Sequence, residues 1–194
     1  MARPREFEIE DALEAAANTF WLRGYEATSL EDLMKATGLH KGSLYKAFNG
    51  KHDLFMRSLD HYLRKIETIR RQSIESEASP KAGLLNWIRR SGELCRDEAG
   101  NWRGCMAVNT IAELGPHDPE VMALMVRDYG QMVALLTDTI ERGQAANEFR
   151  ADLDADATAR LVLTLMAGLT IILKAGIPLE QAMTTTDHMV ELMS

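Results

Sequence analysis

The stretch "TGLHKGSLYKAFNGKHDL", residues 37–54, combines glycines, a serine and lysines with the apolar spacing of a short helix. Gly38 and the pair Asn49–Gly50 are turn residues, which predicts one helix between them. Leu44 and Phe48 lie four residues apart, so they share one face of that helix and can pack inward. The stretch therefore predicts a short helix with an apolar inner face and a small, basic outer face.

The residues before this stretch predict a second short helix and a longer helix in front of it. The segment "TSLEDLMKATG" carries the pattern of a capping box, with Thr28 as the cap and Glu31 three residues later, and its helix stops at Gly38. A helix over residues 8–22 precedes it. Two short helices joined by a tight turn, with a third helix braced against them, are the components of a helix-turn-helix.

Apolar residues recur at helical spacing along the rest of the chain, and no run alternates with the period of a strand. The sequence therefore predicts an all-α fold of about nine helices. After the three N-terminal helices, we expect helices over residues 51–74, 81–96, 105–114, 119–146, 154–175 and 178–193. The polar segment at residues 73–80 predicts a boundary, so the chain divides into residues 1–50, a connecting helix and linker over residues 51–79, and residues 80–194.

Charge is distributed unevenly along the chain. The formal net charge is −7, yet the segment from Lys35 to Arg71 holds nine basic residues against three acidic ones, a local charge of +6. The rest of the chain therefore carries −13. A local basic region can bind nucleic acid even in an acidic protein. We interpret the five basic residues from Arg57 to Arg71 as an ordinary solvated helix face, which leaves the lysines of residues 41–51 as the candidate contacts.

Several protein classes are excluded by composition and motif. Cys95 and Cys105 form no CxxC pair and are too few for a disulfide framework, which favours a reducing compartment and hence the cytoplasm. The N-terminus lacks the apolar region of a signal sequence, and the apolar run at residues 161–173 is too short to span a membrane. No HExxH, phosphate-loop or paired-carboxylate pattern occurs, so we expect no metal, cofactor or catalytic residue.

The segment "AAANTFWLRGYEATSLEDLMKATGLHKGSLYKAFNGKHDL", residues 15–54, resembles the DNA-binding domain of the tetracycline-repressor (TetR-type) family of bacterial transcription regulators. The positions that carry the resemblance are Phe20, Gly24, Tyr25, Thr28, Ser29, Gly38, Gly42, Leu44, Tyr45, Phe48 and Lys51. The resemblance implies a homodimeric repressor that a small hydrophobic effector releases from a double-stranded, palindromic operator. Residues 1–50 would bind the DNA and residues 80–194 the effector, in the bacterial cytoplasm and on the nucleoid when DNA is bound.

The chemistry of residues 37–54 agrees with that resemblance. The first turn of a recognition helix enters the major groove, so small residues and hydrogen-bond donors suit it, and an exposed tyrosine hydroxyl suits a phosphate oxygen. By position in the family pattern, Thr28 would cap the first helix of the unit near the DNA backbone and Gly42 would permit close approach, while Lys51 would anchor the backbone. The predicted DNA-binding residues are Thr28, Lys41, Gly42, Ser43, Tyr45, Lys46 and Lys51.

Two positions depart from the family pattern. His40 stands where a serine cap is most common, which leaves the N-cap of the recognition helix open. Ala47 replaces an aromatic residue or a histidine, which suggests that Lys46 carries more of the contact. Lys41, Ser43 and Lys46 are then left to determine which DNA sequence is bound.

The C-terminal part is expected to hold the dimer interface and the effector. Residues 161–173 are apolar on all sides, so their helix needs two neighbours: the core of its own chain and a partner chain, or alternatively the centre of a monomer. The last two helices would form a four-helix bundle with the partner. The candidate effector residues, each also typical of a protein core, are Trp87, Trp102, Cys105, Met106, Asn109, Tyr129, Met132 and Met166.

Cys105 offers an alternative mode of regulation. It begins a predicted helix just after Arg103, and a helix N-terminus and a nearby cation both favour a thiolate. Cys105 would then sense oxidants or electrophiles, with Cys95 as a resolving thiol, in a redox-responsive version of the same repressor. A plain structural role for both cysteines stays open. A thiol-dependent enzyme is a further alternative, without a supporting Cys/His signature.

Overall fold

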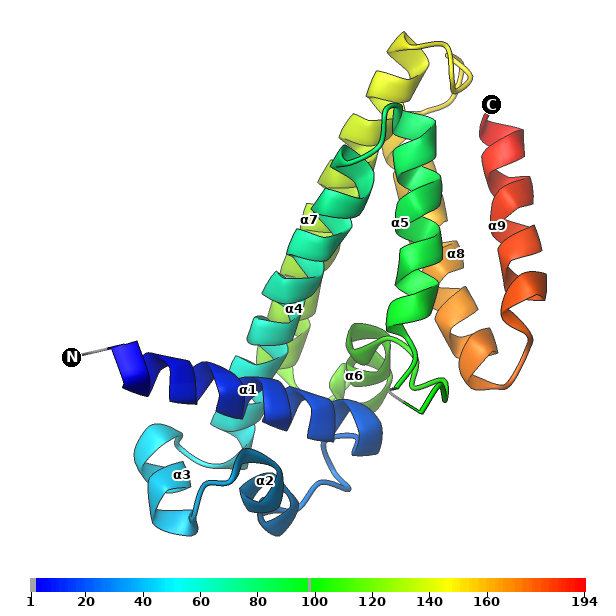
Figure 1. Cartoon of the computed structure of the whole chain (residues 1–194). Coiled ribbons are helices and arrows are strands. Elements are labelled where there is room, and N and C mark those ends of the chain that lie inside the picture. The colour runs from blue at the N-terminus through cyan, green and yellow to red at the C-terminus, as the bar shows by residue number, and fades with distance from the viewer. Residues whose placement is uncertain (1–2, 98) are drawn as a thin grey trace. The chain divides into compact units, whose positions relative to one another are not determined.

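The computed structural model describes residues 3–97 and 99–194, and within those residues it contains helices and no strand (Figure 1). The prediction of an all-α fold is confirmed. The helices are α1 (Arg3–Arg23), α2 (Leu30–Thr37), α3 (Lys41–Ala47), α4 (Lys51–Glu75), α5 (Pro80–Leu94), α6 (Met106–Leu114), α7 (Pro119–Ala145), α8 (Ala155–Lys174) and α9 (Leu179–Met193).

Local capping explains why most helix ends fall close to the predicted ones. α5 begins at Pro80, whose fixed φ suits a first turn, and Ser79 Oγ accepts the backbone N–H of Ala82 at 3.3 Å. α8 follows Asp154, whose carboxylate accepts a backbone N–H of the first turn at 3.0 Å. The largest difference is at α1, which begins at Arg3 rather than at residue 8, because the apolar pattern starts later than the helix does.

The chain forms two compact units that do not follow chain order. The first unit comprises Met1–Ile66 and Asn109–Leu124, and the second comprises Glu67–Val108 and Met125–Ser194. The division therefore falls within α4, α6 and α7, whereas the polar pattern suggested a boundary at residues 73–80. The assignment of separate functions to the parts of the chain stays a prediction.

The first unit is built around aromatic side chains. The Phe20 ring packs edge-on against Phe55 with ring centroids 5.0 Å apart, and Tyr25 lies against Phe55 at 4.9 Å. Leu33 of α2 and Leu44 of α3 are fully buried. A helix of 8 or 7 residues is not stable in isolation, so burial of these side chains is what holds α2 and α3 in helical form.

The second unit has an apolar core contributed mainly by α5, α7, α8 and α9. Its buried threonines satisfy their hydroxyls within their own helices. Thr139 Oγ1 donates to the carbonyl of Leu135 at 2.8 Å, and Thr170 Oγ1 donates to the carbonyl of Ala167 at 2.8 Å. These polar groups therefore enter the core without leaving a hydrogen bond unmade.

An ion pair joins α4 and α7 within the second unit. Arg70 Nη1 lies 2.9 Å from Asp128 Oδ1, and the two side chains are only 12% and 14% exposed. The interpretation of Arg70 as part of a solvated helix face was therefore wrong. No local pattern indicates this pair, because its partners are 58 residues apart and their encounter depends on how α4 packs on α7.

Candidate nucleic-acid interface

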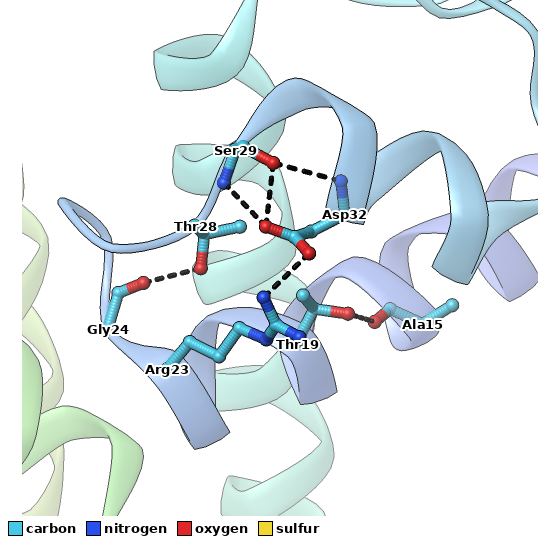
Figure 2. Close-up of polar contacts among 7 residues, drawn as sticks. All are labelled: Ala15, Thr19, Arg23, Gly24, Thr28, Ser29 and Asp32. Atoms are coloured by element: carbon cyan, nitrogen blue, oxygen red, sulfur yellow. Dashed lines mark hydrogen bonds and ion pairs between the residues drawn. The ribbon is translucent and has the colours of Figure 1, made fainter.

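The start of α2 is fixed by a network around Ser29 (Figure 2). Ser29 is the N-cap: its Oγ accepts the backbone N–H of Asp32 at 3.1 Å, and its own N–H donates to Asp32 Oδ2 at 3.0 Å. Arg23 of α1 adds an ion pair to Asp32 Oδ1 at 2.6 Å. The Ser29 hydroxyl and N–H, together with the Arg23 charge, hold the pKa of the Asp32 carboxyl below its usual value.

The predicted capping box was therefore wrong by one residue. Thr28 does not cap α2, since its side chain is 1% exposed and its Oγ1 donates to the carbonyl of Gly24 at 2.6 Å (Figure 2). That bond closes the turn between α1 and α2. Adjacent threonine and serine are both good caps, so the sequence pattern alone could not decide between them.

The turn between α2 and α3 shows that His40 caps α3. Gly38 ends α2 with φ of 69°, a left-handed conformation that glycine adopts without strain. His40 is then the N-cap of α3, and its Nδ1 accepts the backbone N–H of Ser43 at 3.0 Å. An imidazole nitrogen thus replaces the more common serine oxygen.

The two faces of α3 divide as the sequence predicts. Leu44 and Phe48 are 1% and 2% exposed and hold the helix to the first unit, whereas Tyr45 is 48% exposed. Lys46 and Gly42 are also exposed. A Cβ on Gly42 would meet nothing within 4 Å, so the fold itself does not require glycine at that position. The lack of a side chain at Gly42 therefore matters only to a molecule that binds the outer face of α3.

Lys51 lies at the first residue of α4 and is held against the turn between α1 and α2. Its Nζ lies 4.3 Å from the centre of the Tyr25 ring and donates to the carbonyl of Glu26 at 3.4 Å. An ammonium group has three donors, so two remain for a phosphate oxygen. The cation–π contact places the charge without neutralising it.

The basic residues of α4 are largely committed to contacts inside the protein. Lys65 pairs with Glu14 at 2.7 Å, and Arg64 pairs with Asp60. In the part of the chain that the structure describes, no carboxylate pairs with Lys41 or Lys46 of α3. The two lysines of α3 therefore keep their positive charge on the exposed face of this helix.

Arg57 is a contributor that sequence reasoning missed. Its Nη1 donates to the carbonyl of Ala47 at 3.0 Å, and its guanidinium lies 4.7 Å from the centre of the Phe48 ring. A cation at the C-terminus of α3 satisfies a free carbonyl and complements the helix dipole. No local pattern announces this contact, because Arg57 belongs to α4 and not to α3.

The structure brings together only some of the effector candidates. Trp87, Met132 and Met166 belong to the core of the second unit, and Trp102 packs against that core with the Arg96 guanidinium 4.2 Å from its ring centre. Outside that core lie four candidates: the buried Met106, the exposed Tyr129, Cys105, and Asn109, which belongs to the first unit. Among the described residues, no group of three or more His, Cys, Asp or Glu side chains is placed to hold a metal ion.

The two cysteines are free thiols in different surroundings. Cys95 caps the C-terminus of α5 and is buried, and its carbonyl accepts the backbone N–H of Arg103 at 2.8 Å. Burial, and to a lesser degree the Cys105 thiol, raise the pKa of Cys95 to about 12. Cys105 is partly exposed and directly precedes α6.

Comparison with protein families identifies both parts of the chain. Residues 12–57 match the model for bacterial regulatory proteins of the tetR family, and residues 88–186 match the model for the tetracyclin repressor-like C-terminal domain. The HTH-type transcriptional repressor ComR of Escherichia coli is 28% identical over 182 residues, which cover 93% of this chain and 86% of ComR. The uncharacterized HTH-type transcriptional regulator YezE of Bacillus subtilis is 28% identical over 188 residues, 96% of each chain.

A solved structure with DNA is also similar. A cysteine mutant of the TetR family transcriptional regulator CifR, in complex with 26bp double-strand operator DNA, superposes with a TM-score of 0.80. It is 27% identical, and the match covers 95% of each chain. The fold described above is therefore one that holds operator DNA in a related protein.

The cap at His40 gives a direct test of how α3 is held. His40→Ala should lower the free energy of unfolding by roughly 1 kcal/mol, because the Ser43 N–H loses its acceptor. His40→Asn should retain most of the stability, since asparagine is among the best N-cap residues. Denaturant unfolding at a fixed chain concentration measures both, as a change of midpoint at constant slope. Equal midpoints for His40→Ala and the wild type would refute the cap.

Proposed function

Since this chain belongs to the TetR family of bacterial regulatory proteins, we propose that it is a homodimeric repressor that leaves a palindromic operator when a small hydrophobic ligand binds. The family itself establishes the coarser part of this statement: the chain is a DNA-binding transcriptional regulator and not an enzyme. Its site of action would be the bacterial cytoplasm, on the nucleoid when operator DNA is bound.

The outer face of α3 carries the DNA-binding proposal. Gly42, Tyr45 and Lys46 are exposed, whereas Leu44 on the same helix and Phe48 directly after it are buried. This orientation is what a recognition helix in a major groove needs. Two copies related by a twofold axis would place their α3 helices about 34 to 36 Å apart, or a multiple of that distance, on an inverted repeat.

The side chains of this surface fall into two chemical roles. The Tyr45 hydroxyl and the Lys51 ammonium suit phosphate oxygens, which position a protein on any DNA. We assign Lys41, Ser43 and Lys46 to the reading of base edges. Thr28, whose hydroxyl is buried and already bonded, is left to shape the turn rather than to contact DNA.

These two roles predict different effects of substitution. Tyr45→Phe and Lys51→Ala should weaken binding to all DNA sequences, and Lys51→Ala should flatten the plot of log affinity against log salt by about 0.9 for each phosphate that is no longer neutralised. Lys46→Ala should instead change which sequences are enriched from a random DNA pool. Anisotropy titrations at several salt concentrations measure the slope, and selection measures the preference.

Lys65→Ala is the matched control, because this α4 ammonium is already paired with Glu14 at 2.7 Å. It should leave the salt slope unchanged. If Lys51→Ala keeps the wild-type affinity and slope, the phosphate assignment is wrong. If the enriched DNA holds no inverted repeat, the palindromic operator is wrong.

The dimer proposal rests on apolar side chains that α8 leaves uncovered. Leu161 and Ile171 are 61% and 60% exposed, and Ile172 is also exposed. Gly168 lies between them, and a Cβ there would meet nothing within 4 Å, so another helix can approach its backbone closely. Leu192 of α9 is also 61% exposed. A patch of this kind on a regulator is typical of a subunit interface.

By length and composition alone, α8 would also qualify as a membrane-spanning helix. Within the described part of the chain it is the helix that is long and apolar enough to cross a membrane, and 28% of that stretch is buried. The match of residues 88–186 to a repressor C-terminal domain supports the first interpretation, in which a second copy of the chain covers this face.

Breaking this face should produce monomers. Ile171→Glu would bury a charge without a partner in the interface, and we expect it to halve the mass measured by light scattering after size exclusion. Leu22→Glu, an equivalent change at an exposed residue of α1, should leave the mass unchanged. A wild-type chain of monomer mass at micromolar concentration, or an Ile171→Glu variant of dimer mass, would contradict the interface.

The ligand proposal rests on an unpaired indole donor in the core of the second unit. Trp87 is 4% exposed, and among the described residues its indole Nε1 has no hydrogen-bond partner. Within that part of the chain Thr137 Oγ1 on α7 is also buried without a partner, but Thr139 and Thr170 bond to carbonyls of their own helices, which an indole N–H cannot reach in that way. Methionines, whose flexible side chains can repack around a guest, share this core, among them Met132, Met166 and Met189. A ligand that supplies an acceptor would satisfy the buried N–H.

An uncharged ligand fits this core best. A carboxylate would lose its hydration and gain only one neutral donor, which does not compensate the desolvation. A ketone, ester or amide on an apolar skeleton loses little hydration and gains the Trp87 hydrogen bond. Such a compound matches the small hydrophobic effector.

A pair of isosteric probes tests this ligand class. Acetophenone should bind about tenfold more tightly than α-methylstyrene, in which a =CH2 group replaces the carbonyl oxygen. Trp87→Phe should abolish that preference, as measured by calorimetry. Equal affinity of the wild type for both probes would remove Trp87 as the donor. Unchanged operator affinity at saturating acetophenone would show instead that binding does not release DNA.

The thiol alternative has less support. A thiol with a pKa of about 12 is almost wholly protonated at neutral pH, so Cys95 is poorly suited to resolve an oxidised Cys105. Burial of Cys95 under the loop that returns to Arg103 points to a structural role. We therefore favour the ligand-responsive repressor.

A further inference from the structure

Glu113, on the last turn of α6, reaches the turn that precedes α2. Its Oε2 accepts the backbone N–H of Tyr25 at 2.9 Å, and its Oε1 accepts the backbone N–H of Glu26 at 2.8 Å. All three residues belong to the first unit. Each carboxylate oxygen thus accepts one of two consecutive backbone N–H groups. We call this pair of hydrogen bonds the Glu113 clamp.

Gly24 is shaped to accept the clamp. Its φ is +85°, a left-handed conformation that side chains rarely adopt, and a Cβ there would lie 2.9 Å from Glu113 Oε2. The next bond in the turn runs from Thr28 Oγ1 to the Gly24 carbonyl at 2.6 Å. The backbone between α1 and α2 is therefore folded around the carboxylate.

A second tie lies a few residues further along the same segment. Asp118 Oδ2 is 2.7 Å from His52 Nε2 at the start of α4, and Asp118 Oδ1 accepts the backbone N–H of Val121 at 3.1 Å in the first turn of α7. Burial alone would raise the pKa of Asp118, but these hydrogen bonds and the His52 charge lower it below its usual value.

The two ties flank the helix-turn-helix in the sequence. One holds the chain at residues 25 and 26, just before α2, and the other holds it at His52, just after α3. The chain is therefore held on both sides of α2 and α3, by Glu113 at the end of α6 and by Asp118 just before α7. The α6 helix itself starts at Met106, in the second unit.

We propose that Glu113 is a positioning residue for operator binding: its clamp fixes the turn before Ser29 and thereby the orientation of α2 and α3. This inference rests on the proposed function, because it needs an operator to act on.

Electrostatics and positioning make opposite predictions for the loss of this residue. Removal of a negative charge from the DNA-binding unit should strengthen binding to a polyanion if charge alone matters. Loss of the clamp should weaken it, because the turn gains freedom that must be lost again on binding. The sign of the effect therefore separates the two accounts.

The experiment compares Glu113→Ala with Glu113→Gln and with Glu120→Ala on the DNA that the wild-type chain enriches. Glu113→Ala should bind roughly tenfold more weakly with an unchanged salt slope, and Glu113→Gln should lie between, since one amide oxygen can still accept one N–H. Glu120→Ala removes the same charge from the same segment at a side chain that is 75% exposed and makes only a long contact, 3.9 Å, to His52 Nδ1, and it should bind as tightly as the wild type or more tightly.

Hydrogen exchange supplies a second reading that does not depend on DNA. At least one of the Tyr25 and Glu26 amides should exchange faster in Glu113→Gln than in the wild type, while the amides within α4 keep their rates. Wild-type exchange at both positions, or operator binding by Glu113→Ala as tight as by Glu120→Ala, would overturn the proposal. A wild-type chain that enriches no DNA sequence refutes the proposed operator instead, and the exchange rates then still decide whether the clamp exists.

Discussion

Burial of the inner face of α3 is the constraint on which the DNA-binding surface depends. A helix of 7 residues gains too few backbone hydrogen bonds to form alone, so it persists because Leu44 and Phe48 are removed from water and because both of its ends are capped. His40 supplies the cap at one end and Arg57, from α4, at the other. With the inner face fixed, the outer face has only one orientation.

The outer face of α3 is basic because its lysines have no acidic partner among the described residues, whereas several basic residues of α4 do. The chain as a whole is acidic, and several cations of α4 are paired with acidic neighbours: Lys65 with Glu14, Arg64 with Asp60 and Arg70 with the largely buried Asp128. α3 is too short and too rich in small residues to carry compensating acids. Positive charge therefore remains on the outer face of α3, where the proposed contact with a phosphate backbone would lie.

The buried polar groups of the second unit differ in whether they find a hydrogen-bond partner inside the core. Threonine can be buried cheaply because its hydroxyl reaches a carbonyl of its own helix, whereas the Trp87 N–H cannot. An apolar core with an unmet indole donor is a poor solution for stability alone. Such a core is reasonable if the protein has two states and a bound ligand supplies the missing hydrogen bond in one of them.

Features that depend on neighbours a few residues away could be predicted from the order of the amino acids. Apolar spacing predicted the all-α fold, the ends of most helices, the helix-turn-helix and the inward Leu44 and Phe48, because periodicity and capping act within one or two helical turns. The same spacing could not choose Ser29 over Thr28 as a cap, since the two are chemically alike. The Glu113 clamp, whose partners are 87 and 88 residues apart, became visible only in the folded chain. Contacts at that separation exist only where packing brings distant helices together, and no local pattern encodes that meeting.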